Sequence, residues 1–266
     1  MTGETLAGWA GIPIGWNAAG DELVFGPRLT VSETKTRRRG DLRPVLPDDA
    51  ACAPPDAVQY WMYNGISLPE HAAVFNRHGF QYELTLLYPA RLGAERSKTL
   101  GHIHTFPPGS RLNYPEVCEV LWGEALFVFQ ALDADSHTAS LCFAVHARQG
   151  DKVVFPPNLH HLTINPGDEA LIFSDVISTA ARGSYDGLSS MGGAAYLYGN
   201  AAWTLNPRYA GAAPLAVYAA RDYPQVGLRR DVPLYTLAAR EPDRLAWLNE
   251  PGQFHGIFPE LAAFVP

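Results

Sequence analysis

The chain has 266 residues, of which 47% are hydrophobic, and its formal net charge is −7 from 20 basic and 27 acidic residues. This length is enough for one large domain or two small ones. The acidic balance argues against nucleic acid as the main partner, because phosphate binding requires a basic face. The run Arg37, Arg38 and Arg39 is the one strong basic cluster, and its polar surroundings predict a solvated face or an interface.

The cysteine content and the apolar segments indicate the compartment. Three cysteines without a CxxC pair are typical of reduced thiols in a cytosolic protein. No apolar run approaches membrane-spanning length, and the apolar patch at residues 6–16 lacks the preceding basic residues of a signal peptide. We therefore expect a soluble, cytoplasmic protein without a membrane partner.

The predicted elements begin with turns and short apolar segments, and a clear strand pattern starts at residue 82. The predicted strands lie at 82–90, ended by Pro89, then at 116–121, 126–132, 141–148, 152–155, within 156–165 and at 171–178. The turn 122–125 makes a hairpin of two of them. Many short strands separated by turns favour an antiparallel sandwich or barrel. A short helix is predicted at 241–249, with Asp243 as its cap and Pro251 as its stop.

Two histidines and a glutamate gather around the start of the predicted hairpin. His102 and His104 are two residues apart, so both can point to the same side of a sheet. Glu116 heads the next strand, and the hairpin layout can bring it beside them. A third imidazole comes from His160 or His161, and the more polar face of that strand selects His161.

Three neutral imidazoles and one carboxylate suit a divalent first-row metal such as Fe, Mn, Co, Ni or Zn. Open coordination positions would accept substrate oxygens. The ligand types do not decide between these metals. An isolated H-x-H pair is more often a pair of ordinary histidines, so the surrounding motifs carry the metal prediction.

Two short motifs occur in order across this region. The first is H-x-H, then a glutamate and, after six further residues, a glycine: His102, His104, Glu116 and Gly123. The second is G-x5-P-x-N-x2-H-x3-N: Gly150, Pro156, Asn158, His161 and Asn165. The glycines and the first asparagine suit turns that need a left-handed backbone.

These motifs resemble the two signatures of the cupin superfamily, small antiparallel β-barrels that hold a metal on three histidines and a glutamate. The resemblance implies an all-β cupin barrel with an N-terminal arm and a partly helical C-terminal extension. It divides the chain into a cupin domain at 1–209 and an extension at 210–266. The metal ligands that it implies are His102, His104, Glu116 and His161. We expect one divalent ion per subunit, iron first, with Mn, Ni, Co or Zn as alternatives.

Within the cupins, the chain resembles the cupin-type phosphoglucose isomerases. The stretches that carry this likeness include "LTLLYPARLG", "KTLGHIH", "PEVCEVLWGEALFVFQ" and "NPRY", and the likeness runs from about Val24 to Tyr209. It implies a metal-bearing homodimer that interconverts glucose 6-phosphate and fructose 6-phosphate. The positions that match the sugar-phosphate cradle are Thr85, Thr99 and Gly101, and those that match tyrosines near the substrate are Tyr60 and Tyr185.

Three positions depart from the pattern of this family. Cys118 and Ile177 stand where the family has tyrosines, and Gly183 stands where it has a histidine. These changes leave the sugar less certain than the metal. Arg182 or Arg111 could supply charge for the phosphate instead, although each is more often a plain surface arginine.

Glu116 is the candidate base for a cis-enediol route, in which a proton leaves C2 of the sugar and returns to C1. A metal-assisted hydride shift is the alternative and needs no base. Three other functions stay open for the same ligand set. They are an isomerase of an unphosphorylated sugar such as lyxose or mannose, a non-haem iron dioxygenase, and a non-catalytic sugar- or metal-binding cupin with a regulatory role.

Overall fold

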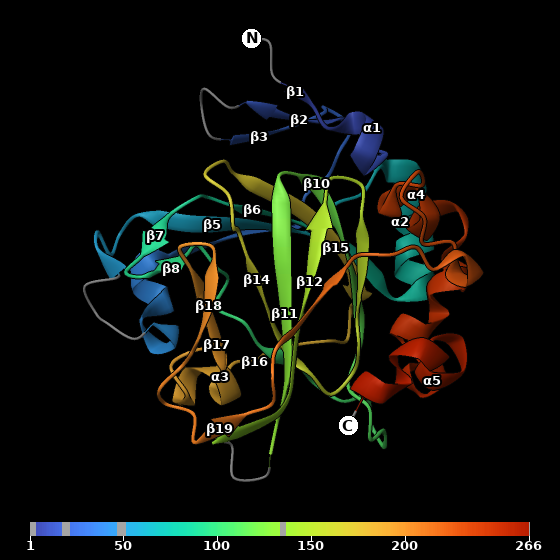
Figure 1. Ribbon diagram of the computed structural model, residues 1–266. Helices are drawn as coiled ribbons and strands as arrows, with labels where there is room; N and C mark the ends of the chain where they lie inside the picture. Colours follow the sequence, from blue (N-terminus) through green and yellow to red (C-terminus); the bar gives the residue numbers. More distant parts are fainter. Residues whose placement is uncertain (1–3, 18–21, 47–51, 134–136, 266) are drawn as a thin grey trace.

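The computed structural model describes residues 4–17, 22–46, 52–133 and 137–265. Two β-sheets face each other and form a barrel (Figure 1). The six-stranded sheet has the order β13 (Lys152–Phe155), β10 (Glu116–Trp122), β15 (Leu171–Ser178), β6 (Phe80–Leu87), β5 (Val58–Asn64) and β4 (Glu33–Arg38). The second sheet has the order β14 (His160–Ile164), β11 (Glu124–Leu132), β12 (Thr138–Arg148) and β19 (Gly211–Ala212), with β20 (Ala216–Ala219) also on β12.

Smaller elements surround the barrel. The short strands are β1 (Glu4–Thr5), β2 (Ile14–Asn17) and β3 (Glu22–Phe25) in one sheet, then the pairs β7 (Arg91–Leu92) with β8 (Glu95–Arg96), β9 (Ile103–His104) with β16 (Gly183–Ser184), and β17 (Tyr196–Gly199) with β18 (Ala202–Leu205). The α-helices are α1 (Ala7–Ala10), α2 (Pro69–His78), α3 (Asp186–Ser190), α4 (Leu234–Arg240) and α5 (Phe254–Ile257). The 3-10 helices are η1 (Arg39–Val45), η3 (Pro224–Val226), η4 (Pro242–Leu248), η5 (Pro251–Gln253) and η6 (Pro259–Phe264).

The six-stranded sheet is covered on both faces, which explains its continuous runs of buried residues. On β10, Val120 faces the barrel interior, whereas Val117 and Leu121 belong to an outer cluster. Every residue of β15 is buried. Sheets buried on both faces read as unbroken apolar runs rather than as alternation.

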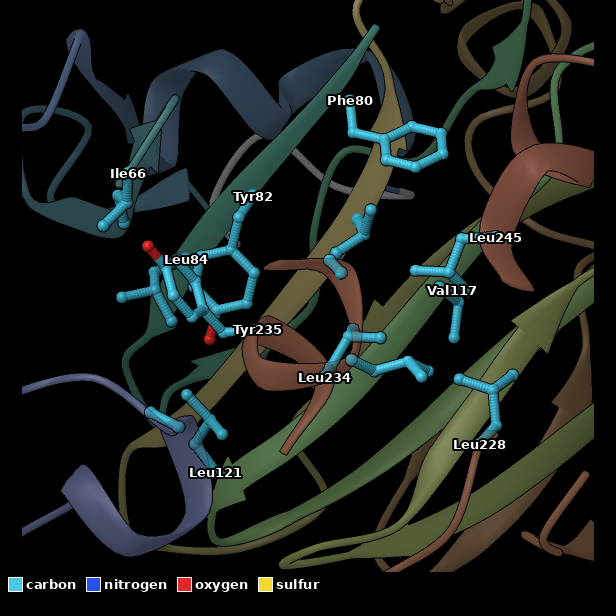
Figure 2. Close-up of a cluster of buried hydrophobic side chains, with 14 of the residues drawn as sticks. Ile66, Phe80, Tyr82, Leu84, Val117, Leu121, Leu228, Leu234, Tyr235 and Leu245 are labelled. Atoms are coloured by element: carbon cyan, nitrogen blue, oxygen red, sulfur yellow. The ribbon is translucent and has the colours of Figure 1, made fainter. Parts of the chain in front are cut away.

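The outer cluster joins the sheet to the C-terminal segment. Figure 2 shows Tyr82 and Val117 of the sheet facing Leu234, Tyr235 and Leu245 of α4 and η4. The rings of Tyr82 and Tyr235 meet edge to face with centroids 5.1 Å apart. Burial of apolar side chains stabilises this contact by about 25 cal/mol for each Å² removed from water.

A buried ion pair ties the same two parts together. Lys152 Nζ lies 2.6 Å from Glu119 Oε1, and their side chains are 1% and 0% exposed. The Leu234 N–H at the start of α4 donates to Glu119 Oε2 at 2.8 Å. Lys152 Nζ also donates to the carbonyl oxygens of Gly150 and Arg230. The extension therefore supplies hydrogen bonds that these buried charges need.

The β-barrel prediction is confirmed, with strands at 152–155 and 171–178. The predicted hairpin is wrong: β10 pairs with β13 and β15, whereas β11 pairs with β12 and β14, because the turn at Gly123 carries the chain from one sheet to the other. The turn residues of the two motifs have left-handed backbone, with φ of 81° at Gly123, 88° at Gly150 and 66° at Asn158. No helix in the described ranges is long and apolar enough to cross a membrane.

The helix predictions were less accurate. The extension is helical, but α4 ends at Arg240, and 242–248 forms a 3-10 helix with Glu241 rather than Asp243 at its cap. Pro242 ends the α-helix because it cannot donate the next backbone hydrogen bond. The helix α2 was not predicted. It buries Phe75 as its one fully covered side chain, so its apolar periodicity is weak.

Candidate active site

Four side chains from three parts of the barrel converge at one end of its interior. His102 and His104 come from β9 and the residue before it, Glu116 begins β10, and His161 lies on β14. A backbone bridge pairs His102 with His161 through N–H···O bonds of 2.9 and 2.8 Å. One possible ligand atom from each of the four lies within 4.8 Å of the others. The structure thus brings together the four residues that the motifs single out.

The ring nitrogens of this group face one another. His102 Nε2 lies 3.1 Å from His104 Nε2 and 3.4 Å from His161 Nε2. Glu116 Oε2 lies 3.4 Å from His104 Nε2 and 3.8 Å from His161 Nε2. His104 Nδ1 lies 2.9 Å from the carbonyl oxygen of Tyr114, and His161 Nδ1 lies 3.2 Å from the carbonyl oxygen of Leu159.

A carbonyl at Nδ1 requires the proton on that nitrogen, so the lone pair lies on Nε2 and points into the group. Burial lowers the pKa of His104 to about 4. Burial and the neighbouring imidazoles hold the pKa of His102 and His161 well below the usual value. The three rings are therefore neutral at pH 7, which is the form that binds a metal. The donor set fits a divalent first-row ion.

Burial and a hydrogen bond change the pKa of Glu116 in opposite directions. Burial raises its pKa to about 7, and the Cys118 thiol, which donates to Glu116 Oε1 at 3.1 Å, opposes that rise. A nearby cation would favour the ionised form in the same way. Cys118 thus contributes a hydrogen bond to the carboxylate from the position where the family has a tyrosine.

The four residues line a cavity of about 820 Å³. All the predicted substrate positions line it as well: Tyr60, Thr85, Thr99, Gly101 and Tyr185. Gly101 has φ +76°, and a Cβ there would lie 2.9 Å from Leu162 Cβ. The chain can pass this close to β14 only with glycine.

Two of the hydroxyls that line the cavity each accept a hydrogen bond from a backbone N–H. Thr99 Oγ1 accepts from the Thr163 N–H at 3.0 Å, which leaves its own hydrogen free to point elsewhere. Tyr60 accepts from the Leu100 N–H at 3.3 Å, and burial raises the pKa of this phenol to about 12. Both groups are therefore neutral hydrogen-bond donors at neutral pH.

Arg37 is a cavity residue that the sequence did not predict. Its guanidinium carbon lies 5.9 Å from the ring centroid of Tyr185, and it pairs across strands with Tyr60. The expectation of a solvated face or interface was wrong for Arg37. The strand period could have suggested this, because Arg37 and Lys35 share a face of β4. The other two arginines bind carbonyls of a neighbouring segment: Arg38 at Asp56 and Arg39 at Ala53.

The two arginines proposed for the phosphate differ in position. Arg182 lines the cavity but donates to the carbonyl oxygens of Thr179 and Ala181. Arg111 is exposed and is not among the lining residues. Gly183 packs against His102, because a Cβ there would lie 3.0 Å from the imidazole.

Glu83 and Asp175 are two further lining residues that the sequence did not single out. Burial, then the neighbouring Glu83 and Glu116, hold the pKa of Asp175 well above its usual value. Burial raises the pKa of Glu83 to about 7. A wall of carboxyl groups, which we call the acidic wall, therefore lies beside the three histidines and Glu116.

The fold and the site together define a cupin-type barrel with a three-histidine, one-glutamate group in its interior. The family model described as "Glucose-6-phosphate isomerase (GPI)" matches residues 36–213. The chain belongs to this family.

Similar proteins agree with that assignment. The chain is 30% identical to the glucose-6-phosphate isomerase of Pyrococcus furiosus and 28% identical to that of Thermococcus litoralis, each over 111 residues, which are 42% of this chain and 53% of the relative. It thus spans about half the length of the curated relatives it matches.

Among solved structures, similarity extends to an oxalate oxidase in complex with glycolate, at 21% identity and a TM-score of 0.28 over 37% of this chain and 41% of that one. It also extends to an oxalate decarboxylase from Bacillus subtilis, at 18% identity and a TM-score of 0.34 over 47% and 28%. These structural likenesses are slight, and we draw nothing from them about this chain.

Proposed function

We propose that the protein is a metal-dependent aldose–ketose isomerase that interconverts glucose 6-phosphate and fructose 6-phosphate. The observation that supports this most is one cavity that contains the converging His102, His104, Glu116 and His161 together with a set of hydroxyls and an arginine. We further propose a homodimer with one divalent ion, iron first, on these four side chains in each subunit.

The bound ion would supply Lewis acidity at the sugar oxygens, which stabilises negative charge that develops there. Glu116 is the proposed base, since it is the one carboxylate of the group that would hold the ion. In the aldose-to-ketose direction it takes a proton from C2 as the C1–C2 double bond of a cis-enediol forms, and it returns the proton to C1. The hydroxyl proton of O2 moves to O1 in the same sequence, so the carbonyl shifts from C1 to C2.

The proposed phosphate site lies in the same cavity and consists of Thr85, Thr99, the Gly101 backbone and Arg37. Phosphate needs several donors, and a guanidinium offers paired N–H groups with a positive charge. Arg37 takes the role that the sequence left to Arg182 or Arg111.

A coupled assay tests the proposal. Protein stripped by a chelator is reloaded with Fe, Mn, Co, Ni or Zn and supplied with fructose 6-phosphate, and glucose 6-phosphate formation is followed. We expect turnover in at least one metal form and its loss in His104→Gln. Glu124→Gln, at the exposed first residue of β11, is the matched control. No turnover in any metal form would contradict the proposal.

The isotope content of the product tests the route. With glucose 6-phosphate as the substrate in deuterated water, proton transfer by Glu116 predicts deuterium at C1 of the fructose 6-phosphate that forms. Complete retention of the C2 hydrogen, measured by mass spectrometry over many turnovers, would instead favour a hydride shift.

The acidic wall favours one second candidate, an isomerase of an unphosphorylated sugar. Glu83 and Asp175 would suit hydroxyls better than a phosphate. Lyxose and mannose are the test substrates, and turnover of either at a higher kcat/KM than fructose 6-phosphate would select this candidate.

A further inference from the structure

Asp175 is a buried carboxyl group that faces the cavity and has no partner of its own. Asp175 is 6% exposed, and it lines the cavity beside the three histidines and Glu116. Across the residues that the structure describes, no hydrogen bond or ion pair reaches its carboxylate. The neighbouring Cys118 thiol donates to Glu116 instead.

The sheet register fixes where this carboxyl lies. The central strand β15 runs between β10 and β6, and the Cα pairs Cys118 with Asp175 and Asp175 with Glu83. On the same face, Glu116 lies two residues before Cys118 on β10, and Thr85 lies two residues after Glu83 on β6. Asp175 therefore lies between the proposed metal site and the proposed phosphate site.

The fold gains nothing from a carboxyl at this position. An uncompensated buried carboxyl is destabilising, whereas an apolar side chain of similar size is tolerated at most buried sites. Glu83 is hydrogen-bonded by Gln81 along its own strand and not by Asp175. A buried polar group without a partner is a marker of a ligand that supplies one.

A second metal ion does not explain Asp175. Within the described ranges, the sole group of possible ligand atoms close enough to share an ion is His102, His104, Glu116 and His161. A second phosphate does not explain it either, because a carboxyl group offers a phosphate at most one donor and repels it when ionised. Hydroxyl groups remain, since each can donate to a carboxylate without carrying charge.

We propose that Asp175, with Glu83 beside it, forms a hydroxyl-binding subsite for the carbon chain of a polyhydroxy substrate. This inference rests on the proposed function, because it assumes a sugar that spans from the metal site to Arg37. Asp175 accepts hydrogen bonds from the chain hydroxyls and is a specificity-determining residue. The phosphate of such a substrate lies at the Arg37 end, away from the carboxylates.

The test uses manganese-loaded protein and two probes, sorbitol 6-phosphate and inorganic phosphate, in titration calorimetry. Asp175→Leu replaces the carboxyl by an apolar group of similar size, and Asp175→Asn keeps an acceptor oxygen. Ser174→Ala, on the same strand but facing the other way, is the matched control. Melting temperatures are measured for every variant.

We expect Asp175→Leu to weaken the binding of sorbitol 6-phosphate by about ten-fold or more, because the hydrogen bonds that the carboxyl group makes with the chain hydroxyls are lost. Asp175→Asn should weaken it less, and inorganic phosphate should bind each variant at least as tightly as it binds the wild type. Asp175→Leu should melt at or above the wild-type temperature, which a structural role for the carboxyl would not allow. Ser174→Ala should change neither affinity.

Sorbitol 6-phosphate affinity within two-fold of wild type in Asp175→Leu would overturn the inference. Equal weakening of both probes, or a lower melting temperature of this variant, would do the same. The isomerase assay is separate. Polyol binding that depends on Asp175 without turnover would refute the proposed reaction alone, whereas turnover with unchanged polyol binding would refute the subsite alone.

Discussion

Arg37 occupies a position in the cavity that the other nearby cations do not share. Lys35 is paired with Glu33 at 2.7 Å, and Arg182 donates to backbone carbonyls. Arg37 instead lies over the ring of Tyr185 and lines the cavity. A cation over an aromatic face is held in place by about 0.5–1 kcal/mol even at exposed sites.

Removal of this charge should act on substrate binding. We expect Arg37→Met to raise KM for fructose 6-phosphate by about ten-fold or more, with a smaller change in kcat, because the phosphate is remote from the reacting carbons. Steady-state kinetics of the metal-loaded enzyme measure both constants. Arg148→Met, on the outside of β12, should leave KM unchanged, and a fall in kcat alone for Arg37→Met would refute the assignment.

Glu116 should make metal binding depend on pH. Burial raises its pKa to about 7, so below that pH a proton must leave the carboxyl before the ion binds. Apparent affinity should therefore rise about ten-fold per unit up to pH 7 and flatten above it. The three histidines, with pKa lowered by burial, are already neutral over this range.

Competition titrations of Mn²⁺ against a chelator at pH 6, 7 and 8 measure this dependence. Glu116→Gln cannot titrate at this position, so its affinity should be lower but nearly flat over the same range. A slope that persists in Glu116→Gln would assign the proton to another group.

At the scale of elements, strand alternation and motif spacing were enough to predict most barrel strands and the convergence of the four motif residues. The predicted hairpin failed because β10 and β11 belong to different sheets. Alternation and spacing could not predict which strands lie opposite one another. Asp175 and Glu83 share a row only because β15 runs between β10 and β6, and such long-range pairings leave no local signal. For Arg37 the strand period groups it with Lys35 on one face of β4, but only the pairing with Tyr60 on another strand places that face at the cavity.

The buried pair of Lys152 and Glu119 joins β13, β10 and α4. Lys152→Met should lower the free energy of unfolding by about 3–5 kcal/mol, because Glu119 is left without its opposite charge. The double variant Glu119→Leu/Lys152→Met should lose less, since it removes the uncompensated charge. Chemical denaturation measures both, and equal losses would contradict a charge-based cause.

At the scale of the whole molecule, the extension completes the core of the six-stranded sheet. Trp247, Phe254 and Phe258 are at most 1% exposed and belong to the same cluster as Val117 and Tyr82. The extension therefore forms the outer layer over one face of the barrel, as the helices beside β15 show in Figure 1.

A chain that ends at Tyr209 should not reach a packed native state. Loss of the outer layer exposes the apolar face of the sheet, so we expect a lost near-UV circular dichroism signal and strong binding of a hydrophobic dye. A chain that ends at Phe258 lacks only η6 and the residues after it, none of which is fully buried where described, and should stay folded. A cooperative melt of the shorter chain would contradict this prediction.

Because β20 follows β12 late in the chain, their parallel pairing leaves β12 without this neighbour for part of synthesis. The end of β20, at residue 219, lies about 71 residues after the end of β12. At about 5–20 residues per second, it is therefore synthesised roughly 4–14 s later. During that interval the outer edge of β12 offers unpaired N–H and C=O groups to any neighbouring chain. Once β20 is in place, the new edge is four residues long. The period of greatest aggregation risk is therefore the time on the ribosome, and slower translation of residues 149–219 would lengthen it.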